Sequence, residues 1–229
     1  MANPTRFLDG VTTVPASGPL GFYPYPAPFH TGSKAGLGSV RYENDFDTFT
    51  NDYLVTGLSS TFALVAASVG GAAVLTPGGA AVASSAYKSA QFLQFQAGNK
   101  AWFVSRFQVS ALAGTEYVGL QAGAAVTDGL WFAVSATGVI SLVATTASVA
   151  TTLVAALPTV ALAATWVDVG FYYNGVELLV YQNDVVVARI LAASLPLTTA
   201  ILTPVFDIVP TASQTLTVDY VVSACELVR

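Results

Sequence analysis

Three acidic side chains alternate along one short stretch near the start of the chain. Glu43, Asp45 and Asp47 are separated by single residues, and on a β-strand this spacing turns all three carboxylates to one face, about 7 Å apart along the chain. Paired carboxylates in a cleft can hydrolyse a glycosidic bond when the pKa of one is raised. With Asp52 they could instead hold Ca²⁺, which takes about six to eight oxygen ligands. We favour a charged edge strand that resists unwanted pairing, and therefore expect no metal.

A second set of side chains has the chemistry of a sugar site. Trp166 and Tyr172 offer aromatic faces for stacking, and Asp184 offers a carboxylate for hydroxyl groups. Strand alternation places Trp166, Asp168 and Tyr172 on one face, whereas the apolar residues between them share the other face and are predicted to line the core. The outer row is then either a glycan contact or a surface that packs on another subunit.

Arg106 lies in the middle of an apolar stretch, on the face with Trp102 and Gln108. A guanidinium at such a position pairs with a carboxylate or stacks on an aromatic ring. We expect a pair with an acid of the same chain or stacking on Trp102. The alternative is a bridge to a carboxylate of another protein.

The chain has a single cysteine, Cys225, and a single histidine, His30. One cysteine excludes a disulfide within the chain, and the two residues together exclude zinc sites built from Cys and His. A Ser-His-Asp or Cys-His apparatus would need His30, which lies in a proline-rich stretch. We therefore predict a protein that is not an enzyme and has no cofactor, with Cys225 as a small core residue.

Charged residues are scarce: they make up 9% of the chain, against 54% hydrophobic residues. This composition excludes disorder for most of the chain. The eight Lys and Arg residues are scattered and the net charge is −5, so no nucleic-acid partner is expected. A surface with so few charges favours association, and we predict a homo-oligomer, a dimer or a trimer. Gly and Pro interrupt the long uncharged stretches, so no membrane partner is expected either, and the start lacks the pattern of a signal peptide.

Residues 1–38 are predicted to form an extended N-terminal arm. Prolines alternate with aromatic residues over its second half, and proline favours an extended chain near polyproline II. We expect Phe22, Tyr23, Tyr25 and Phe29 to anchor the arm on a neighbouring subunit. The alternative is a disordered leader.

Residues 39–229 are predicted to form one all-β domain, a two-sheet antiparallel sandwich, because short alternating runs are separated by turn signals. Asn174-Gly175 predicts a type I′ hairpin, and Asn183-Asp184 begins a further strand. The predicted strands cover 40–47, 60–65, 72–75, 90–96, 101–110, 117–122, 130–135, 139–144, 166–173, 176–182, 185–191, 205–209 and 216–227.

The stretch Trp-Val-Asp-Val-Gly-Phe-Tyr-Tyr-Asn-Gly from Trp166 to Gly175, continued to Ala188, resembles the centre of laminin-G and concanavalin-A-like jelly rolls. Residues 103–107, 118–120 and 128–132 resemble the preceding strands of that fold, 218–221 the closing strand and 41–46 the opening strand. The resemblance therefore covers roughly residues 39–229 and implies a jelly roll. Asp184 stands where the family often has glycine. Glucanases of this fold carry Glu-x-Asp-x-x-Glu on a central strand; the acids from Glu43 to Asp47 depart from that pattern, which argues against glucanase activity.

The combination of this arm with an Ala-, Val-, Thr- and Gly-rich jelly roll resembles virion proteins of tailed phages, of the capsid decoration, cement or head-fibre type. The resemblance implies a non-enzymatic structural protein, made in the host cytoplasm, that stabilises the capsid exterior by contacting the major capsid protein or other virion subunits. The alternative is a lectin-like head fibre or adhesin that binds a host glycan through Trp166, Tyr172 and Asp184. A cellular structural protein is the third interpretation.

Deletion of residues 1–38 tests the separation of arm and sandwich. We expect a soluble β domain with nearly the same thermal transition, because the arm holds little that could complete a core, and a sharp loss of binding to particles in co-sedimentation. Changing Phe22, Tyr23 and Tyr25 together to serine should do most of the same damage. A truncated domain that fails to fold would place the arm in the core. Normal binding of the truncated domain would rule out that the arm anchors the protein on a neighbouring subunit.

Overall fold

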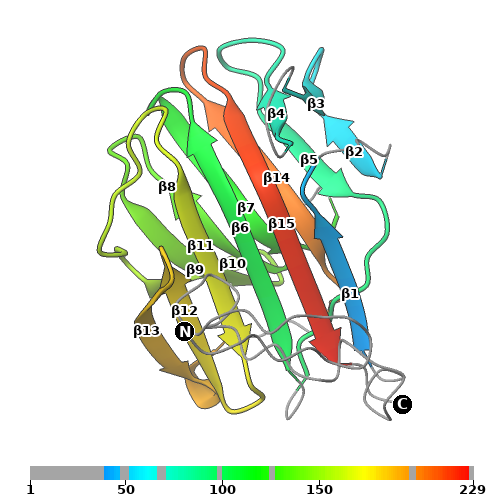
Figure 1. Cartoon of the computed structure of the whole chain (residues 1–229), viewed down its shortest axis with the longest axis vertical. Coiled ribbons are helices and arrows are strands. Elements are labelled where there is room, and N and C mark those ends of the chain that lie inside the picture. The colour runs from blue at the N-terminus through cyan, green and yellow to red at the C-terminus, as the bar shows by residue number, and fades with distance from the viewer. Residues whose placement is uncertain are drawn as a thin grey trace, which may run out of the picture.

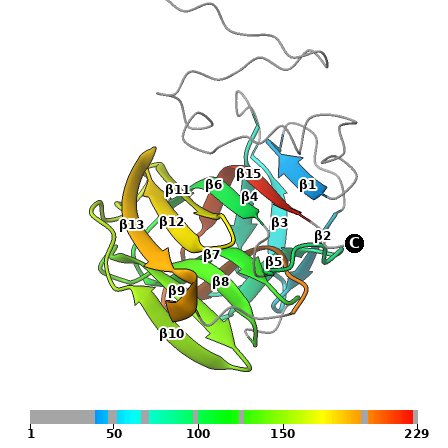
Figure 2. The ribbon, with the colours of Figure 1, turned by 90° about the horizontal axis from the view of Figure 1, so that it is seen from below.

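The computed structural model describes residues 39–46, 52–65, 71–96, 100–123, 127–195 and 200–226. Phe22, Tyr23, Tyr25 and Phe29 of the arm lie outside these residues, as does Asp47. The described chain forms fifteen β-strands and one turn of 3₁₀ helix, η3 (Ala192–Ser194). Strands are packed in two layers, as Figures 1 and 2 show from two sides.

All strand pairs in both layers are antiparallel. The front sheet has the order β13 (Val185–Leu191), β12 (Glu177–Gln182), β11 (Val167–Tyr173), β6 (Ala101–Val109), β15 (Leu216–Glu226), β4 (Ala73–Thr76) and β3 (Thr61–Leu64), and β1 (Ser39–Asn44) also pairs with β15. The back sheet has the order β10 (Val149–Val154), β9 (Ile140–Thr146), β8 (Gly129–Val134), β7 (Gly114–Gln121), β14 (Thr203–Pro210), β5 (Ser84–Lys88) and β2 (Tyr53–Thr56). The predicted two-sheet antiparallel jelly roll is confirmed.

The core between the sheets is built on phenylalanines that face inward from central strands. Phe103 of β6 stacks on Phe171 of β11, with ring centroids 5.5 Å apart, and Phe132 of β8 approaches Phe171 from the back sheet at 6.3 Å. All three are fully buried, and each contributes about 2–3 kcal/mol by leaving water. The core-facing row of β11 is thus confirmed, with Asp168 and Tyr172 on the opposite face.

The hairpin turns differ from the expected types. Asn183 and Asp184 have φ of 47° and 67°. Positive φ at both central positions, as a type I′ turn requires, therefore occurs in the turn between β12 and β13. In the β11–β12 turn only Gly175 has positive φ, 91°. The side chain of Asn174 accepts hydrogen bonds from the N–H groups of Val176 and Glu177, each 2.8 Å, and this side-chain turn replaces the type I′ geometry.

Three predicted features were wrong. The expected strand at 90–96 makes only one bridge, Leu93 to Leu202, because its apolar side chains fill the end of the core. Strands β2 and β5 were missed because they are short. β10, Val-Ala-Thr-Thr-Leu-Val, was missed because its polar and apolar residues do not alternate. β1 ends at Asn44, whose side chain accepts the Phe46 N–H at 2.8 Å, so the exposed Asp45 follows the strand and does not continue a row of carboxylates.

No helix within the described ranges is long and apolar enough to cross a membrane.

Two carboxyl groups are buried in the back sheet. Glu116 of β7 faces the core, where the amide of Gln214 donates to it, and burial raises its pKa to about 7 against the opposing effect of that hydrogen bond. Asp207 of β14 lies on the outer face, paired across the sheet with Tyr117 and Ser85. Burial also raises the pKa of Asp207 to about 7.

These two groups predict how stability depends on pH. Their ordinary pKa values are 4.5 and 3.8, so between about pH 4 and 7 the folded state binds more protons than the unfolded state. The free energy of unfolding should therefore fall as pH rises through this window, by at most about 3 kcal/mol for Glu116 and about 4 kcal/mol for Asp207. Glu116→Gln and Asp207→Asn should each remove part of the slope in urea titrations from pH 4 to 8, and the double variant most of it. A slope that both variants retain would contradict this.

Candidate functional site

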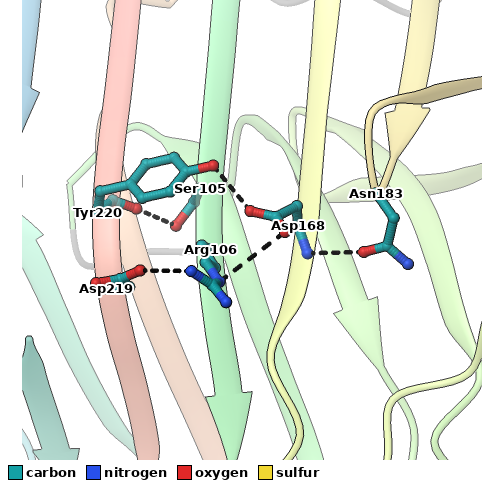
Figure 3. A network of polar contacts seen from close by, with 6 residues as sticks. All are labelled: Ser105, Arg106, Asp168, Asn183, Asp219 and Tyr220. Atoms are coloured by element: carbon teal, nitrogen blue, oxygen red, sulfur yellow. Dashed lines mark hydrogen bonds and ion pairs between the residues drawn. The ribbon is translucent and has the colours of Figure 1, made fainter. Parts of the chain in front are cut away.

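The outer face of the front sheet carries a cluster of polar side chains centred on Arg106 (Figure 3). Arg106 of β6 lies between Asp168 of β11 and Asp219 of β15. Its Nη1 is 3.2 Å from Asp219 Oδ2, and its Nε is 3.9 Å from Asp168 Oδ2. The side chains of all three are partly exposed. The cluster therefore joins three adjacent strands through charges that remain in contact with solvent.

A β-bulge in β15 gives the cluster its third member. Tyr220 is paired with Arg106 and Val218 with Phe107, so Asp219 is an extra residue in β15. In a regular strand, alternation would put Asp219 and Tyr220 on opposite faces. The bulge brings both side chains to the outer face, beside β6. Ser105 stabilises the irregular backbone, since its hydroxyl donates to the Tyr220 carbonyl at 2.9 Å.

Asp168 is held from both sides. The Tyr220 hydroxyl donates to its Oδ1 at 2.8 Å. On the other side, the backbone N–H of Asp168 donates to Asn183 Oδ1 at 3.1 Å, and its carbonyl accepts the Asn183 N–H at 2.9 Å. The turn with Asn183 and Asp184 is thereby fastened to β11, next to the acid.

Burial, and after it the charge of Asp168, shifts the pKa values of two groups in the cluster. Burial raises the pKa of the Tyr220 hydroxyl, and the negative charge of Asp168 raises it further. Burial likewise raises the pKa of Asp184, with Asp168 as the second cause. Tyr220 thus remains a hydrogen-bond donor over the physiological pH range, whereas the neighbouring carboxylates supply acceptors.

An aromatic ring completes the cluster. The guanidinium of Arg106 lies over the ring of Trp166, 5.4 Å from its centroid, a cation–π contact that also fixes the plane of the guanidinium. The expected pairing of Arg106 with acids of its own chain is confirmed. The alternative, stacking of Arg106 on Trp102, is wrong. The guanidinium lies over Trp166 instead, because Val167 pairs with Phe107 and Trp166 therefore lies next to Gln108, the next residue after Arg106 on the outer face of β6.

The predicted glycan residues do not form one site. Trp166 and Asp184 join the Arg106 cluster. Tyr172 lies four residues along β11 from Asp168, roughly 13 Å away, where its ring stacks on Trp102 at 4.7 Å and is buried. Tyr172 therefore belongs to an apolar cluster with Trp102, Val104 and Tyr181, against which Tyr220 of the Arg106 cluster packs.

Sequence reasoning missed Asp219 and Tyr220 as site residues. The signal was present: inward-facing Leu216 and Val218 are two residues apart, but the next, Val221, follows after three. Such a break in an otherwise regular alternation is the pattern of a bulge.

Within the part of the chain that the structure describes, no three His, Cys, Asp or Glu side chains are placed to hold a metal ion. The described Asp45 is exposed, and no such group includes it.

Neither a protein-family model nor a curated protein matches the sequence. The fold does match solved structures. A prokaryotic β-1,3-1,4-glucanase (lichenase) derived from a mouse hindgut metagenome superposes with a TM-score of 0.59 at 13% identity, over 80% of this chain and 98% of that one. The endo-1,3-β-glucanase from Streptomyces sioyaensis gives 0.57 at 12%, over 83% and 98%. The potassium-bound carbohydrate recognition domain of Emp46p gives 0.57 at 9%, over 81% and 96%. These likenesses show a concanavalin-A-like jelly-roll fold.

Replacing Arg106 tests whether the cluster contributes to stability. Arg106→Met keeps an apolar stem against Trp166 but leaves Asp168 and Asp219 without their cation, and should cost about 1–2 kcal/mol in urea unfolding. Arg189→Met is the matched control, because the Arg189 side chain is 64% exposed in its pair with Glu177 and such pairs contribute under about 0.5 kcal/mol. Equal small losses in both variants would contradict a structural role for the cluster.

Proposed function

We propose that this protein is a non-catalytic carbohydrate-binding jelly roll, with its ligand held on the outer face of the front sheet at the Arg106 cluster. The observation that carries the proposal is the cluster itself: the Arg106 guanidinium lies over the Trp166 ring and pairs with Asp168, and Asp184 is near enough to Asp168 for the two carboxyl groups to interact. The side chains of Arg106 and Asp168 are partly exposed, as is Asp184. Adjacent donors and acceptors of this kind can form hydrogen bonds with neighbouring sugar hydroxyls. The indole ring can stack on the apolar face of a sugar ring.

The cluster favours binding because its groups are already fixed. Asp168 is oriented by Tyr220 and by the Asn183 turn, and Asp219 by Arg106. A ligand that docks against fixed groups does not have to order them, which lowers the entropic cost of association.

The same contacts argue against hydrolysis as the function. A glycosidase needs one carboxyl group free to protonate the leaving oxygen and a second free to act on the other side of the bond. Here Asp168 and Asp219 share one guanidinium, and Tyr220 also donates to Asp168. These structural contacts argue against either carboxyl group carrying a proton to a leaving oxygen, whereas the remaining lone pairs can still accept hydrogen bonds from sugar hydroxyls. The fold shared with glucanases and with a carbohydrate recognition domain supports carbohydrate as the ligand class.

A structural role in a phage virion is the second candidate. Large apolar side chains are exposed at Leu58, Val149, Val176, Val185 and Leu191, each at 60% or more, in a chain with only 9% charged residues. Such a surface suits contacts with capsid or other virion subunits. Particle binding by the truncated and full chains distinguishes this role from glycan binding.

A glycan array followed by calorimetry on the best hit tests the proposal. Trp166→Ala should weaken binding by at least about tenfold, since it removes the stacking surface, and Asp184→Asn should weaken it severalfold by removing a charged acceptor. Tyr87→Ala is the matched control: Tyr87 is a half-buried aromatic on the outer face of the back sheet, so its loss should leave affinity unchanged.

Two outcomes would overturn the proposal. One is an array without saturable binding to any glycan. The other is a bound glycan whose affinity is unaffected by Trp166→Ala and Asp184→Asn, which would place the ligand elsewhere on the molecule.

A further inference from the structure

β10 lies at one end of the back sheet and forms one of its two edges (Figure 2). Residues Val149 to Thr152 are exposed, with Val149 at 67%. Among the described residues no strand pairs with the free side of β10. An unpaired edge presents backbone N–H and C=O groups to any strand that fits it.

β10 has few of the features that normally prevent pairing at an edge. Its sequence, Val-Ala-Thr-Thr-Leu-Val, contains no charge and no proline, although lysine, proline and inward-pointing charges are the usual protection. The edge strand of the front sheet on the same side of the order, β13, carries Arg189. A register shift between Thr152 and Val154 marks a bulge, which limits any straight pairing to the first part of β10.

The turn before β10 determines which backbone groups point outward. Ala147 and Ser148 have φ of 49° and 67°, a two-residue turn in which Thr146 and Val149 are the closing pair. The N–H of Val149 therefore points to β9. Because hydrogen-bonding direction alternates along an antiparallel strand, Ala150 and Thr152 point their N–H and C=O groups away from the sheet.

This alternation restricts how a second β10 could pair. Outward-pointing residues must face outward-pointing residues, so Ala150 must lie opposite Ala150 or Thr152 of the other copy. The register with Ala150 opposite Thr152 is symmetric about Thr151. It contains two hydrogen-bonded pairs, Ala150 with Thr152 and Thr152 with Ala150, and therefore four backbone hydrogen bonds. It also places Thr151 opposite Thr151, a cross-strand pair of a favourable kind.

We propose that two copies of this chain associate through the β10 edge, antiparallel, with Thr151 on the two-fold axis. The back sheets then form one continuous sheet across the dimer, and the contact is isologous, as two-fold symmetry requires. The low content of charged residues predicts a homo-oligomer, and this contact says where its subunits meet. The contact is independent of the proposed glycan site, which lies on the other sheet.

Engineered disulfides test the register directly. In the proposed dimer the two Thr151 residues form a non-hydrogen-bonded pair with Cα atoms about 4.5 Å apart, inside the range that a disulfide spans. Thr151→Cys should therefore form a covalent dimer on mild oxidation of the full chain, seen on non-reducing gels. Ala150→Cys is the matched control, because its symmetry mate is offset diagonally, beyond about 7 Å. The native Cys225 is buried and does not compete.

Light scattering provides the second readout, on the full chain without cysteines added. The wild-type protein should show a concentration-dependent dimer, and Thr151→Lys should shift it to monomer by placing two like charges on the axis. Val185→Lys, on the exposed edge of β13, should leave the dimer intact. A monomer at every concentration, dissociation by Val185→Lys instead, or equal cross-linking at positions 150 and 151 would overturn the proposal.

Discussion

The alternation of side chains along a strand is the constraint on which the structure depends. Each central strand turns one row of residues toward the partner sheet, and the rows meet as a continuous layer of aromatic rings, with Phe171 touching Phe103 on its own sheet and Phe132 on the other. A shift by one residue would exchange the buried and exposed rows of a strand. The same constraint turns Asp168 to the outer face of β11, where it is free to carry polar chemistry.

The bulge in β15 is the exception that makes the site. It lets one strand supply both an acid and a phenol to the same face, opposite a single arginine. A bulge changes the local direction of side chains without requiring a loop, so Asp219 and Tyr220 remain, like Asp168, on strands. Positions set in this way vary less than positions on loops.

Sequence reasoning predicted the fold class and most strands, because alternation is a local pattern and turn residues such as Asn183 and Gly175 mark where it stops. It predicted the two faces of β11 for the same reason. It failed where the outcome depends on distant partners. Nothing local indicates that Tyr172 is covered by Trp102, that residues 90–96 fill the end of the core, or that Asp219 meets an arginine 113 residues away.

The position of β15 has a consequence for synthesis. It is the last strand of the described chain, yet it lies inside the front sheet, between β6 on one side and β4 and β1 on the other. Chains emerge from the ribosome in order, and domains tend to fold as units. Until β15 emerges, the front sheet is divided in two and its inner face is incomplete. From the emergence of β6 until that of β15, a nascent chain of this protein therefore leaves the edges of β6 and β4 unpaired and exposes phenylalanines of the inner face, such as Phe103 and Phe107, which chaperones can protect.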